Sequence, residues 1–417
     1  MTLETELRER LERARQAARQ LALASSERKN RALSTLAELL RESTVTILNT
    51  NRQDVENASA AGNGSAFVER LTLTPERIAA MAHSVEQVAA LPDPAGETIA
   101  RWRRPNGLEI AQVRVPIGVI AIIFESRPNV TIDAAVLGLK AGNAVVLRGG
   151  REALATNGVL VSLIEQALTA ADLDPHSVMF IGNPNREVVQ ILKRLPEAID
   201  LIIPRGGRAL KDALTDSSVP LLPHFDGICH TYVDQAADLR KAEEICFNAK
   251  CSRPSVCNAM ETLLVHEKIA PAFLPRIADR FRQAGVEMRG DERVCKFILD
   301  ATPATATDWD TEYLDLTLAI KVVDSVEQAV AFIARHGSGL ADAIVTEDEE
   351  AALRFEREVD SATVYVNAST RFTDGFEFGF GAETGISTNR LHARGPMGLR
   401  ELTTYKYVVR GNGQVRA

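Results

Sequence analysis

Residues 119–124 read Val119-Ile120-Ala121-Ile122-Ile123-Phe124, an unbroken apolar run with the length of a β-strand. Such a run is typical of a strand buried on both faces, as in a parallel sheet. A helix-like stretch from Thr131 to Ala141 follows, and Gly142-Asn143 ends it. The next apolar run is Ala144-Val145-Val146-Leu147. Strand, helix and strand in this order predict a βαβ unit.

The same alternation extends along the chain in both directions. A helix from Asn157 to Ala171 and strands at Val178–Ile181 and Leu201–Pro204 complete a Rossmann-like parallel sheet. A second α/β region runs from about residue 228 to 370. Between its elements, Ala301 to Asp310 makes a polar loop without a recognisable functional motif. Its expected strands are Cys229–Val233, Ala259–Val265, Leu316–Val323, Ala343–Val345 and Thr363–Val366.

The residues before the first sheet are expected to be mostly helical, with helix starts at Ser25 and at Thr74-Pro75. Asn106-Gly107, followed by alternating residues, predicts a β-hairpin over about 100–115. That hairpin is either an association element or a plain surface feature. The final stretch, Thr403 to Val409, has strand character and could pair with it.

Composition limits the class of protein. The chain has 417 residues, 45% of them hydrophobic and 25% charged, which is ordinary for a soluble protein of two domains. A net charge of −8 argues against nucleic-acid binding. Five cysteines without a C-x-x-C pair predict neither a disulfide framework nor a metal site. No signal peptide or membrane span is recognisable, so we expect a cytoplasmic protein.

One polar stretch between a predicted helix and a predicted strand concentrates reactive side chains. Phe247-Asn248-Ala249-Lys250-Cys251-Ser252-Arg253-Pro254-Ser255-Val256-Cys257-Asn258 holds two cysteines, two cations and several hydroxyl or amide groups. A loop of this kind on a rigid scaffold is where functional groups are usually presented. The alternative is a surface loop whose cysteines are small buried fillers.

Two of the predicted strands end in a pair of glycines flanked by arginines, Arg148-Gly149-Gly150-Arg151 and Arg205-Gly206-Gly207-Arg208. Glycines after a strand allow a ligand close to the backbone, and a helix N-terminus favours an anion. The G-x-G-x-x-G fingerprint is absent, so two tight turns are an equally good interpretation. Arg148 together with Arg151 favours a phosphorylated cofactor.

From residue 116 almost to the end, the chain resembles the aldehyde dehydrogenase superfamily, and within it the γ-glutamyl phosphate reductase (glutamate-5-semialdehyde dehydrogenase) family of proline biosynthesis. The blocks that carry the resemblance are long and occur in the same order. They are Pro116–Ile120, Glu125–Thr131, Lys140–Gly150, Ile203–Gly207, Arg253–Ser255 with Cys257-Asn258, Val364–Gly375 and Leu391–Leu399.

The resemblance implies an α/β, aldehyde-dehydrogenase-like fold. It has a Rossmann-like cofactor domain over 1–227, with the hairpin as oligomerisation element, and an α/β catalytic domain over 228–372. A return segment and C-terminal oligomerisation strand follow over 373–417. The active site is expected between the first two. The implied reaction is the NADPH-dependent reduction of L-glutamyl 5-phosphate to L-glutamate 5-semialdehyde and phosphate. Cys257 would be the nucleophile and would carry the acyl group as a thioester, since a thiolate both attacks and leaves readily.

A cationic neighbourhood favours the thiolate, and Lys250 and Arg253 are candidates for it. The tetrahedral intermediate needs hydrogen-bond donors, and the resemblance suggests the Cys257 backbone N–H and the amide of Asn129. Hydrolytic relatives carry a glutamate base in an E-L-G-G motif, whereas this chain has His224-Phe225-Asp226-Gly227. Loss of that base suits an enzyme whose acyl acceptor is phosphate. His224 acts as an acid or base, or is a loop histidine without a role.

For the cofactor, Arg148 stands where relatives keep a lysine near the adenosine ribose. Arg151 falls near an acidic position of NAD-preferring relatives, so a guanidinium there should admit a 2′-phosphate and favour NADPH. Gly206 and Gly207 would lie near the pyrophosphate, and Glu312 would hold the nicotinamide ribose. A surface acid is the plainer interpretation of Glu312.

The substrate carries a phosphate and an α-carboxylate, so several cations and donors should line its pocket. Each candidate cation is as readily a structural ion-pair partner. The candidates are Ser126, Arg127, Arg253, Asn367, Ser369, Arg371 and Arg394.

Two other functions fit parts of the pattern. A coenzyme-A-acylating aldehyde dehydrogenase shares the missing base, although the blocks around Arg253 and Arg371 favour the phosphate enzyme. A non-catalytic protein of this fold would be expected to have lost Cys257. Expected partners are further copies of the chain in a homo-oligomer and the upstream glutamate 5-kinase, because γ-glutamyl phosphate cyclises easily.

Overall fold

The computed structural model describes residues 2–222 and 226–416, and the chain divides into two compact units. Unit 1 comprises Met1–His224, Gly379–Gly385 and Met397–Ala417, and unit 2 comprises Phe225–Phe378 and Ile386–Pro396. Unit 2 is thus inserted between the two ends of unit 1. Where the sequence suggests a single tail segment over 373–417, the structure divides these residues between the units.

Unit 1 contains the parallel sheet predicted from Val119–Phe124. Its strands lie in the order β5-β4-β3-β6. Every residue of β3 is buried, as the unbroken apolar run requires. Helix α1 packs Leu7, Leu11 and Ala14 against apolar side chains of β3, β4 and β5. The strands are β3 (Val119–Phe124), β4 (Ala144–Arg148), β5 (Val178–Phe180) and β6 (Leu201–Arg205).

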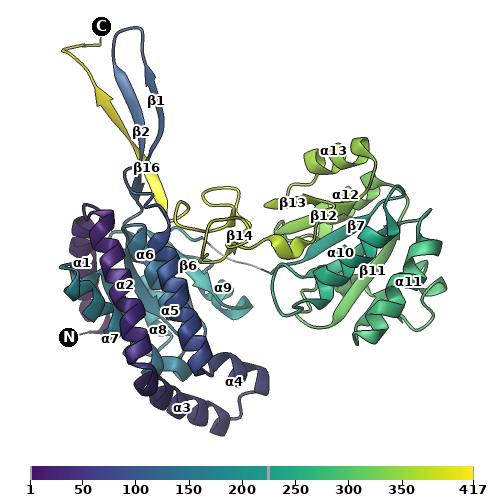
Figure 1. The fold of residues 1–417 in the computed structure, drawn as a ribbon, viewed down its shortest axis with the longest axis horizontal. Coiled ribbons are helices and arrows are strands. Elements are labelled where there is room, and N and C mark those ends of the chain that lie inside the picture. The colour runs from purple at the N-terminus through teal and green to yellow at the C-terminus, as the bar shows by residue number, and fades with distance from the viewer. Residues whose placement is uncertain (1, 223–225, 417) are drawn as a thin grey trace. The chain divides into compact units, whose positions relative to one another are not determined.

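Two helices of unit 1 begin at the predicted starts, whereas those expected from Thr131 and Asn157 begin at Pro128 and Leu154. Ser25 and Thr74 are N-caps whose side chains accept a hydrogen bond from the backbone three residues on, as predicted. Figure 1 shows the long N-terminal helices beside the sheet. The helices are α1 (Leu3–Leu21), α2 (Ser26–Glu42), α3 (Thr44–Ala60), α4 (Ser65–Leu71), α5 (Pro75–Ala90), α6 (Pro128–Lys140), α7 (Leu154–Ala170), α8 (Glu187–Leu192) and α9 (Arg208–Leu214), with 3-10 turns η1 (Arg151–Ala153) and η2 (Pro175–Ser177).

The predicted hairpin is present, and the C-terminal strand joins it. β1 (Thr98–Arg103) and β2 (Glu109–Pro116) are antiparallel, and the turn between them has Gly107 at φ +85°, where a side chain would be strained. β16 (Thr403–Arg410) pairs with β2 along its whole length. The three strands form a ribbon that extends away from the helices of unit 1 (Figure 1).

Unit 2 is a parallel sheet with the order β10-β9-β11-β8-β7-β12-β13 and a helix pair on each face. α10 and α11 pack on one face through Cys246, Phe273 and Phe281. α12 and α13 cover the other face and bury Tyr232 and Phe355. The strands are β7 (Cys229–Val233), β8 (Met260–His266), β9 (Glu287–Gly290), β10 (Thr302–Pro303), β11 (Thr317–Val323), β12 (Ala341–Val345) and β13 (Thr363–Val366). The helices are α10 (Leu239–Cys251), α11 (Ala270–Gln283), α12 (Val326–His336) and α13 (Glu349–Glu358).

Two parts of unit 2 differ from the sequence-based expectation. β9 was not predicted, because Glu287-Met288-Arg289-Gly290 carries two charges and a glycine in four residues. The loop Ala301 to Asp310 contains β10 and a 3-10 turn, η4 (Ala306–Asp310), closed by a capping box between Thr305 and Asp308. The remaining short elements are η3 (Val294–Lys296), η5 (Thr370–Phe372), β14 (Ile386–Ser387) and β15 (Gly395–Pro396).

Candidate active site

Cys257 lies in the short loop between α10 and β8, and its side chain is half-buried. The thiol of Cys229, the first residue of β7, donates to the carbonyl oxygen of Cys257 at 3.3 Å. A Cβ atom on Gly227 would lie 1.9 Å from the same carbonyl oxygen. Only a glycine allows this approach, so the start of β7 fixes the backbone of the Cys257 loop.

Asn258, next to the cysteine, ties this loop to the segment after β13. Its Nδ2 donates to the carbonyl oxygen of Thr373 at 2.8 Å. Its own carbonyl oxygen accepts from Thr370 Oγ1 at 2.7 Å, and its Oδ1 accepts from Arg371 Nη1. These hydrogen bonds join the Cys257 loop to residues 370–373 and so hold Arg371 beside that loop.

Arg371 and Arg253 form a group of cations at this loop. Arg371 is half-buried and its Nε donates to Ser252 Oγ at 3.1 Å. Burial lowers the pKa of Arg371, repulsion from Arg253 lowers it further, and the Cys257 side chain acts in the opposite direction. Among the described residues neither arginine forms an ion pair with a carboxylate, although Asp374 attracts Arg371 and opposes the lowering of its pKa. Their positive charge is therefore available to an anion.

Glu312 also meets the start of β7. Its Oε1 accepts from the backbone N–H of Gly227 at 2.8 Å. Burial raises the pKa of Glu312, and this hydrogen bond opposes the rise. Gly227 thus contacts Glu312 through its nitrogen and Cys257 through its α-carbon, so the structure brings two predicted site residues to either side of one glycine.

Lys250 has a different environment from the one expected. Its Nζ lies 2.6 Å from Glu261 Oε2, and both side chains are fully buried. Because that ammonium already faces a carboxylate, the structure favours Arg371 rather than Lys250 as the cation beside Cys257.

Three of the expected substrate residues have structural partners in unit 2. Asn367 has φ +54°. Its Oδ1 accepts from the backbone N–H of Thr346, and its Nδ2 donates to the carbonyl oxygen of Thr346. Ser369 caps η5 by accepting from the backbone N–H of Arg371. Arg394 is engaged by Asp360, with its Nη1 2.9 Å from a carboxylate oxygen. His224 lies outside the described residues.

In unit 1, the loops after β3 and β4 contact each other. Ser126 is buried, and its Oγ donates to Glu152 Oε2 at 2.6 Å. The Nε of Arg151 donates to the other oxygen of Glu152 at 2.9 Å. Burial alone would raise the pKa of Glu152, but these two hydrogen bonds, a backbone hydrogen bond and the charge of Arg151 together lower it. A Cβ on Gly150 would lie 2.0 Å from Ser126 Oγ, which explains one of the two glycines.

Arg148 and the second glycine pair lie on neighbouring loops of this unit. The Nη2 of Arg148 donates to the carbonyl of Pro184 at 3.1 Å, whereas its Nε is buried without a hydrogen-bond partner among the described residues. Burial lowers the pKa of Arg148, and repulsion from Arg186 adds to this. Gly207 N–H donates to Glu125 Oε1 at 2.9 Å, and Glu125 had no role in the sequence-based interpretation.

Arg127 and Asn129 stand at the start of α6 and are both exposed. The Nδ2 of Asn129 donates to Asp133 Oδ2 at 3.2 Å, one turn further along the helix. Burial raises the pKa of Asp133 to about 6, and the Asn129 hydrogen bond opposes the rise. Asp133 is a second residue that the sequence alone did not single out.

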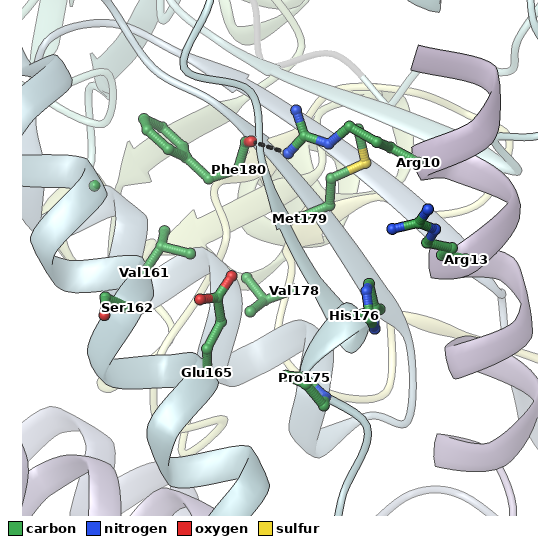
Figure 2. Close-up of a pocket in the computed structure, with 11 residues that line it drawn as sticks. Arg10, Arg13, Val161, Ser162, Glu165, Pro175, His176, Val178, Met179 and Phe180 are labelled. Carbon is green, nitrogen blue, oxygen red and sulfur yellow. Dashed lines mark hydrogen bonds between the residues drawn. The ribbon is translucent and has the colours of Figure 1, made fainter. Parts of the chain in front are cut away.

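A separate cavity of about 470 Å³ opens at the free edge of β5, between α1 and α7 (Figure 2). Arg10 and Glu165 line opposite walls of it, and Arg10 Nη2 donates to the carbonyl of Phe180 at 2.6 Å. No predicted site residue lines this cavity. It is therefore not part of the candidate site.

Comparison with known proteins shows the family of the chain. The model of the aldehyde dehydrogenase family matches residues 2–295 and 297–408. A curated gamma-glutamyl phosphate reductase from Carboxydothermus hydrogenoformans is 56% identical over 97% of this chain and 98% of that protein. One from Enterococcus faecalis is 50% identical over 99% of both.

Solved structures give the same result. The crystal structure of gamma-glutamyl phosphate reductase from Thermotoga maritima matches with a TM-score of 0.97 and 50% identity over 99% of this chain and 100% of that one. An acetylating aldehyde dehydrogenase from Geobacillus thermoglucosidasius, at 17% identity and a TM-score of 0.70 over 99% of this chain and 98% of that one, shares the fold. The chain belongs to the aldehyde dehydrogenase family.

Proposed function

We propose that the protein reduces L-glutamyl 5-phosphate to L-glutamate 5-semialdehyde and phosphate, with NADPH as reductant, in proline biosynthesis. Relatives with that name at 50–56% identity over nearly the whole chain support the reaction. The observation that carries it is the pair of arginines, Arg253 and Arg371, beside Cys257 without a carboxylate partner among the described residues. An acyl phosphate brings the negative charge that such a pair lacks.

In the first step the Cys257 thiolate attacks the γ-acyl carbon of the substrate. The bond between that carbon and the phosphate oxygen breaks, inorganic phosphate leaves, and the acyl group remains on sulfur as a thioester. Arg253 and Arg371 bind the phosphate and stabilise it as it departs. Arg127 is a further candidate for the substrate's anionic groups.

The tetrahedral intermediate places a negative charge on the former carbonyl oxygen. The backbone N–H of Cys257 and the amide of Asn129 are the proposed donors to that oxygen. One N–H of the Asn129 amide is used by Asp133, and its second makes no hydrogen bond to the residues that the structure describes. Asp133 therefore orients the amide and leaves a donor for the substrate.

Members of this family and the reductase relatives use a nicotinamide cofactor, and the loops of unit 1 fit its phosphates. When bound, the cofactor supplies the hydride that reduces the thioester. Arg148 has a buried Nε that still needs an acceptor, and Arg151 is exposed beside it in sequence, so we assign them to the adenosine 2′-phosphate of NADPH. Gly206 and Gly207 approach the pyrophosphate, and Glu312 accepts from the nicotinamide ribose.

The remaining candidates have weaker support. Ser126 is committed to Glu152, while Asn367 and Ser369 hold backbone groups, so we assign these three to shaping the site. Arg394 would have to leave Asp360 to bind substrate.

The ribbon of β1, β2 and β16 supports a homo-oligomer. It exposes a set of large apolar side chains, and Trp102 and Tyr407 contact each other edge to face within it. An exposed apolar sheet face of this kind suits a second copy of the chain. We also propose a cytoplasmic location and delivery of the labile substrate by a glutamate 5-kinase. The exposed residues are Ile99, Trp102, Tyr405, Tyr407 and Val409.

The test is the reverse reaction. Glutamate 5-semialdehyde with NADP⁺ should form NADPH when inorganic phosphate is added and should form none when phosphate is omitted. Turnover supported by coenzyme A in place of phosphate would replace this proposal with an acylating dehydrogenase. Binding of cofactor without turnover under either condition would favour a non-catalytic protein of this fold.

A further inference from the structure

A fully buried ion pair brackets the Cys257 loop. Lys250 is in the last turn of α10, before the loop, and Glu261 is the second residue of β8, after it. The Nζ of Lys250 lies 2.6 Å from Glu261 Oε2, and neither side chain is exposed. Removing two charges from water is costly, and an apolar pair of similar size often gives equal or greater stability. Stability alone therefore does not account for this pair.

The second carboxylate oxygen of Glu261 reaches another segment. Glu261 Oε1 accepts from the backbone N–H of Leu314 at 3.3 Å. Leu314 has φ +54°, a left-handed conformation that leucine rarely adopts. Such strain persists only where the surroundings enforce it, and it is common at functional sites. Here the buried carboxylate of Glu261 binds the residue that has this conformation, two residues after Glu312.

Tyr313, between Glu312 and Leu314, is also held. Its hydroxyl donates to Asp308 Oδ1 at 2.8 Å, and its ring faces the charged groups of Lys250 and Arg289, which are 5.8 and 5.5 Å from its centre. Arg289 in turn pairs with Asp308 at 2.7 Å. The two residues that follow Glu312 are thus both fixed by charged groups.

We infer that the Lys250–Glu261 pair is a positioning device that holds the Glu312 carboxylate at the cofactor's nicotinamide ribose and couples it to the Cys257 loop. The inference rests on the proposed function only for the role of Glu312. The pair spans the Cys257 loop at one end and the Leu314 backbone at the other. Gly227 joins the same two parts a second time, through its contacts with Glu312 and Cys257.

The positioning role depends on the charges of Lys250 and Glu261. Burial raises the pKa of Glu261, to about 7, and Lys250 opposes the rise. A neutral carboxyl or amide could still accept from Leu314, but it would not draw the Lys250 ammonium against the ring of Tyr313. Loss of the charge should therefore loosen the segment that carries Glu312 while the fold survives.

The experiment uses the full-length enzyme with Lys250→Met, Glu261→Gln and the double variant. We measure the Kd for NADP⁺ by titration calorimetry, kcat and KM for NADP⁺ in the reverse reaction, the rate of Cys257 alkylation by iodoacetamide, and Tm. The double variant should keep its Tm within a few degrees while Kd and KM for NADP⁺ rise about 10-fold or more, a typical effect of removing a supporting contact. Lys29→Met, which breaks a buried Lys29–Asp93 pair in unit 1, should lower Tm and leave Kd unchanged.

A Glu312→Ala series completes the design. If the pair acts through Glu312, combining Glu312→Ala with the double variant should weaken NADP⁺ binding no more than Glu312→Ala alone. Additive losses, an unchanged Kd in Glu312→Ala, or a lowered Tm with an unchanged Kd would each overturn the inference. Should the single variants fold poorly, the double variant decides, because it leaves no unpaired buried charge. Phosphate-independent wild-type activity would refute the proposed function. The Kd values for NADP⁺ would still show whether the Lys250–Glu261 pair positions Glu312.

Discussion

The segments around Arg371 and Arg394 each lie in a block that resembles the family, but they differ in charge balance. Both follow β13, and both place an arginine close to a glycine. Arg371 is half-buried and hydrogen-bonds neutral groups on the Cys257 loop, while Arg253 repels it and Asp374 attracts it without an ion pair among the described residues. Arg394 is paired with Asp360, which also pairs with Arg390. The contrast teaches that two arginines proposed from matching sequence blocks can differ in counter-charge, and we expect the one without an ion pair to be the substrate cation.

The largest effect is expected at the thiol that Arg371 faces. Cys257→Ser should reduce turnover by about 10³-fold or more, because a hydroxyl is a much weaker nucleophile at neutral pH. Cys251→Ser is the matched control: it is six residues earlier, partly buried, and should keep activity within about 3-fold. Initial rates of the reverse reaction measure both. Full activity in Cys257→Ser would show that Cys257 is not the nucleophile and would leave Arg253 and Arg371 without an assigned function.

Arg371→Met and Arg394→Met test whether an arginine without an ion pair binds the phosphate and an ion-paired one does not. Arg371→Met should raise KM for phosphate in the reverse reaction by roughly 10-fold to 100-fold, the worth of a hydrogen bond to a charged group. Arg394→Met should change KM by less than about 3-fold and stability by at most about 1 kcal/mol, because surface ion pairs contribute little. Equal effects in the two variants would mean that charge balance does not mark the substrate cation.

A smaller effect is expected for the cofactor. Arg151 is mostly exposed and, unlike Arg371, already pairs with a carboxylate, that of its neighbour Glu152, so a 2′-phosphate would share its guanidinium with Glu152. Arg151→Glu should lower the preference for NADPH over NADH, in kcat/KM, by about 10-fold, since an acidic group repels a 2′-phosphate. Arg13→Glu, an exposed arginine at the β5 cavity, should leave the preference unchanged. An unaltered ratio in Arg151→Glu would move the 2′-phosphate contact to another residue.

The smallest effect concerns two carboxyl groups, one with no ion pair among the described residues (Asp133) and one paired with two arginines (Asp360). Burial raises the pKa of Asp133 to about 6, whereas Arg394 and Arg390 lower the pKa of Asp360. A raised folded pKa gives stability that is present below about pH 4 and is lost as pH rises towards 6. Asp133→Asn should therefore gain about 1–2 kcal/mol over wild type between pH 4 and pH 7 in urea unfolding.

Asp360→Asn should behave in the opposite sense. A lowered folded pKa gives stability that is present above the ordinary pKa and is lost as pH falls below about 4. The variant should be less stable than wild type at pH 7, and the difference should shrink in acid. A parallel pH dependence in both variants would contradict the assigned environments.

Much of the fold was predictable because its signals are local. The unbroken run of β3, the Asn106-Gly107 turn and the N-caps Ser25 and Thr74 each specify their own structure. β9 was missed because it is short and charged, and pairing with β11 rather than its own pattern makes it a strand. The substrate candidates in unit 2 followed from matching blocks, but whether a side chain binds an anion or a backbone depends on neighbours far away in the chain.

The structural roles of Asn258, Gly227 and Glu261 illustrate this limit. Asn258 binds Thr373, 115 residues further along the chain, so no window of sequence reveals the contact. Gly227 is informative only once Cys257 is known to lie against it. Glu261 did offer a signal, because it is a charged residue in an otherwise apolar strand, and Lys250 lies one helical turn after the buried Cys246.

β16 has a consequence for synthesis of the chain. Its pairing with β2 joins residues 109–116 to residues 403–410, so the ribbon cannot close until residues 403–410 have been translated. The long edge of β2 is open during that time, and unpaired edges invite association between nascent chains. Truncation after Leu402 would make this exposure permanent. A tag placed directly after β16 extends the strand that completes the ribbon, whereas one before α1 leaves the ribbon free to close.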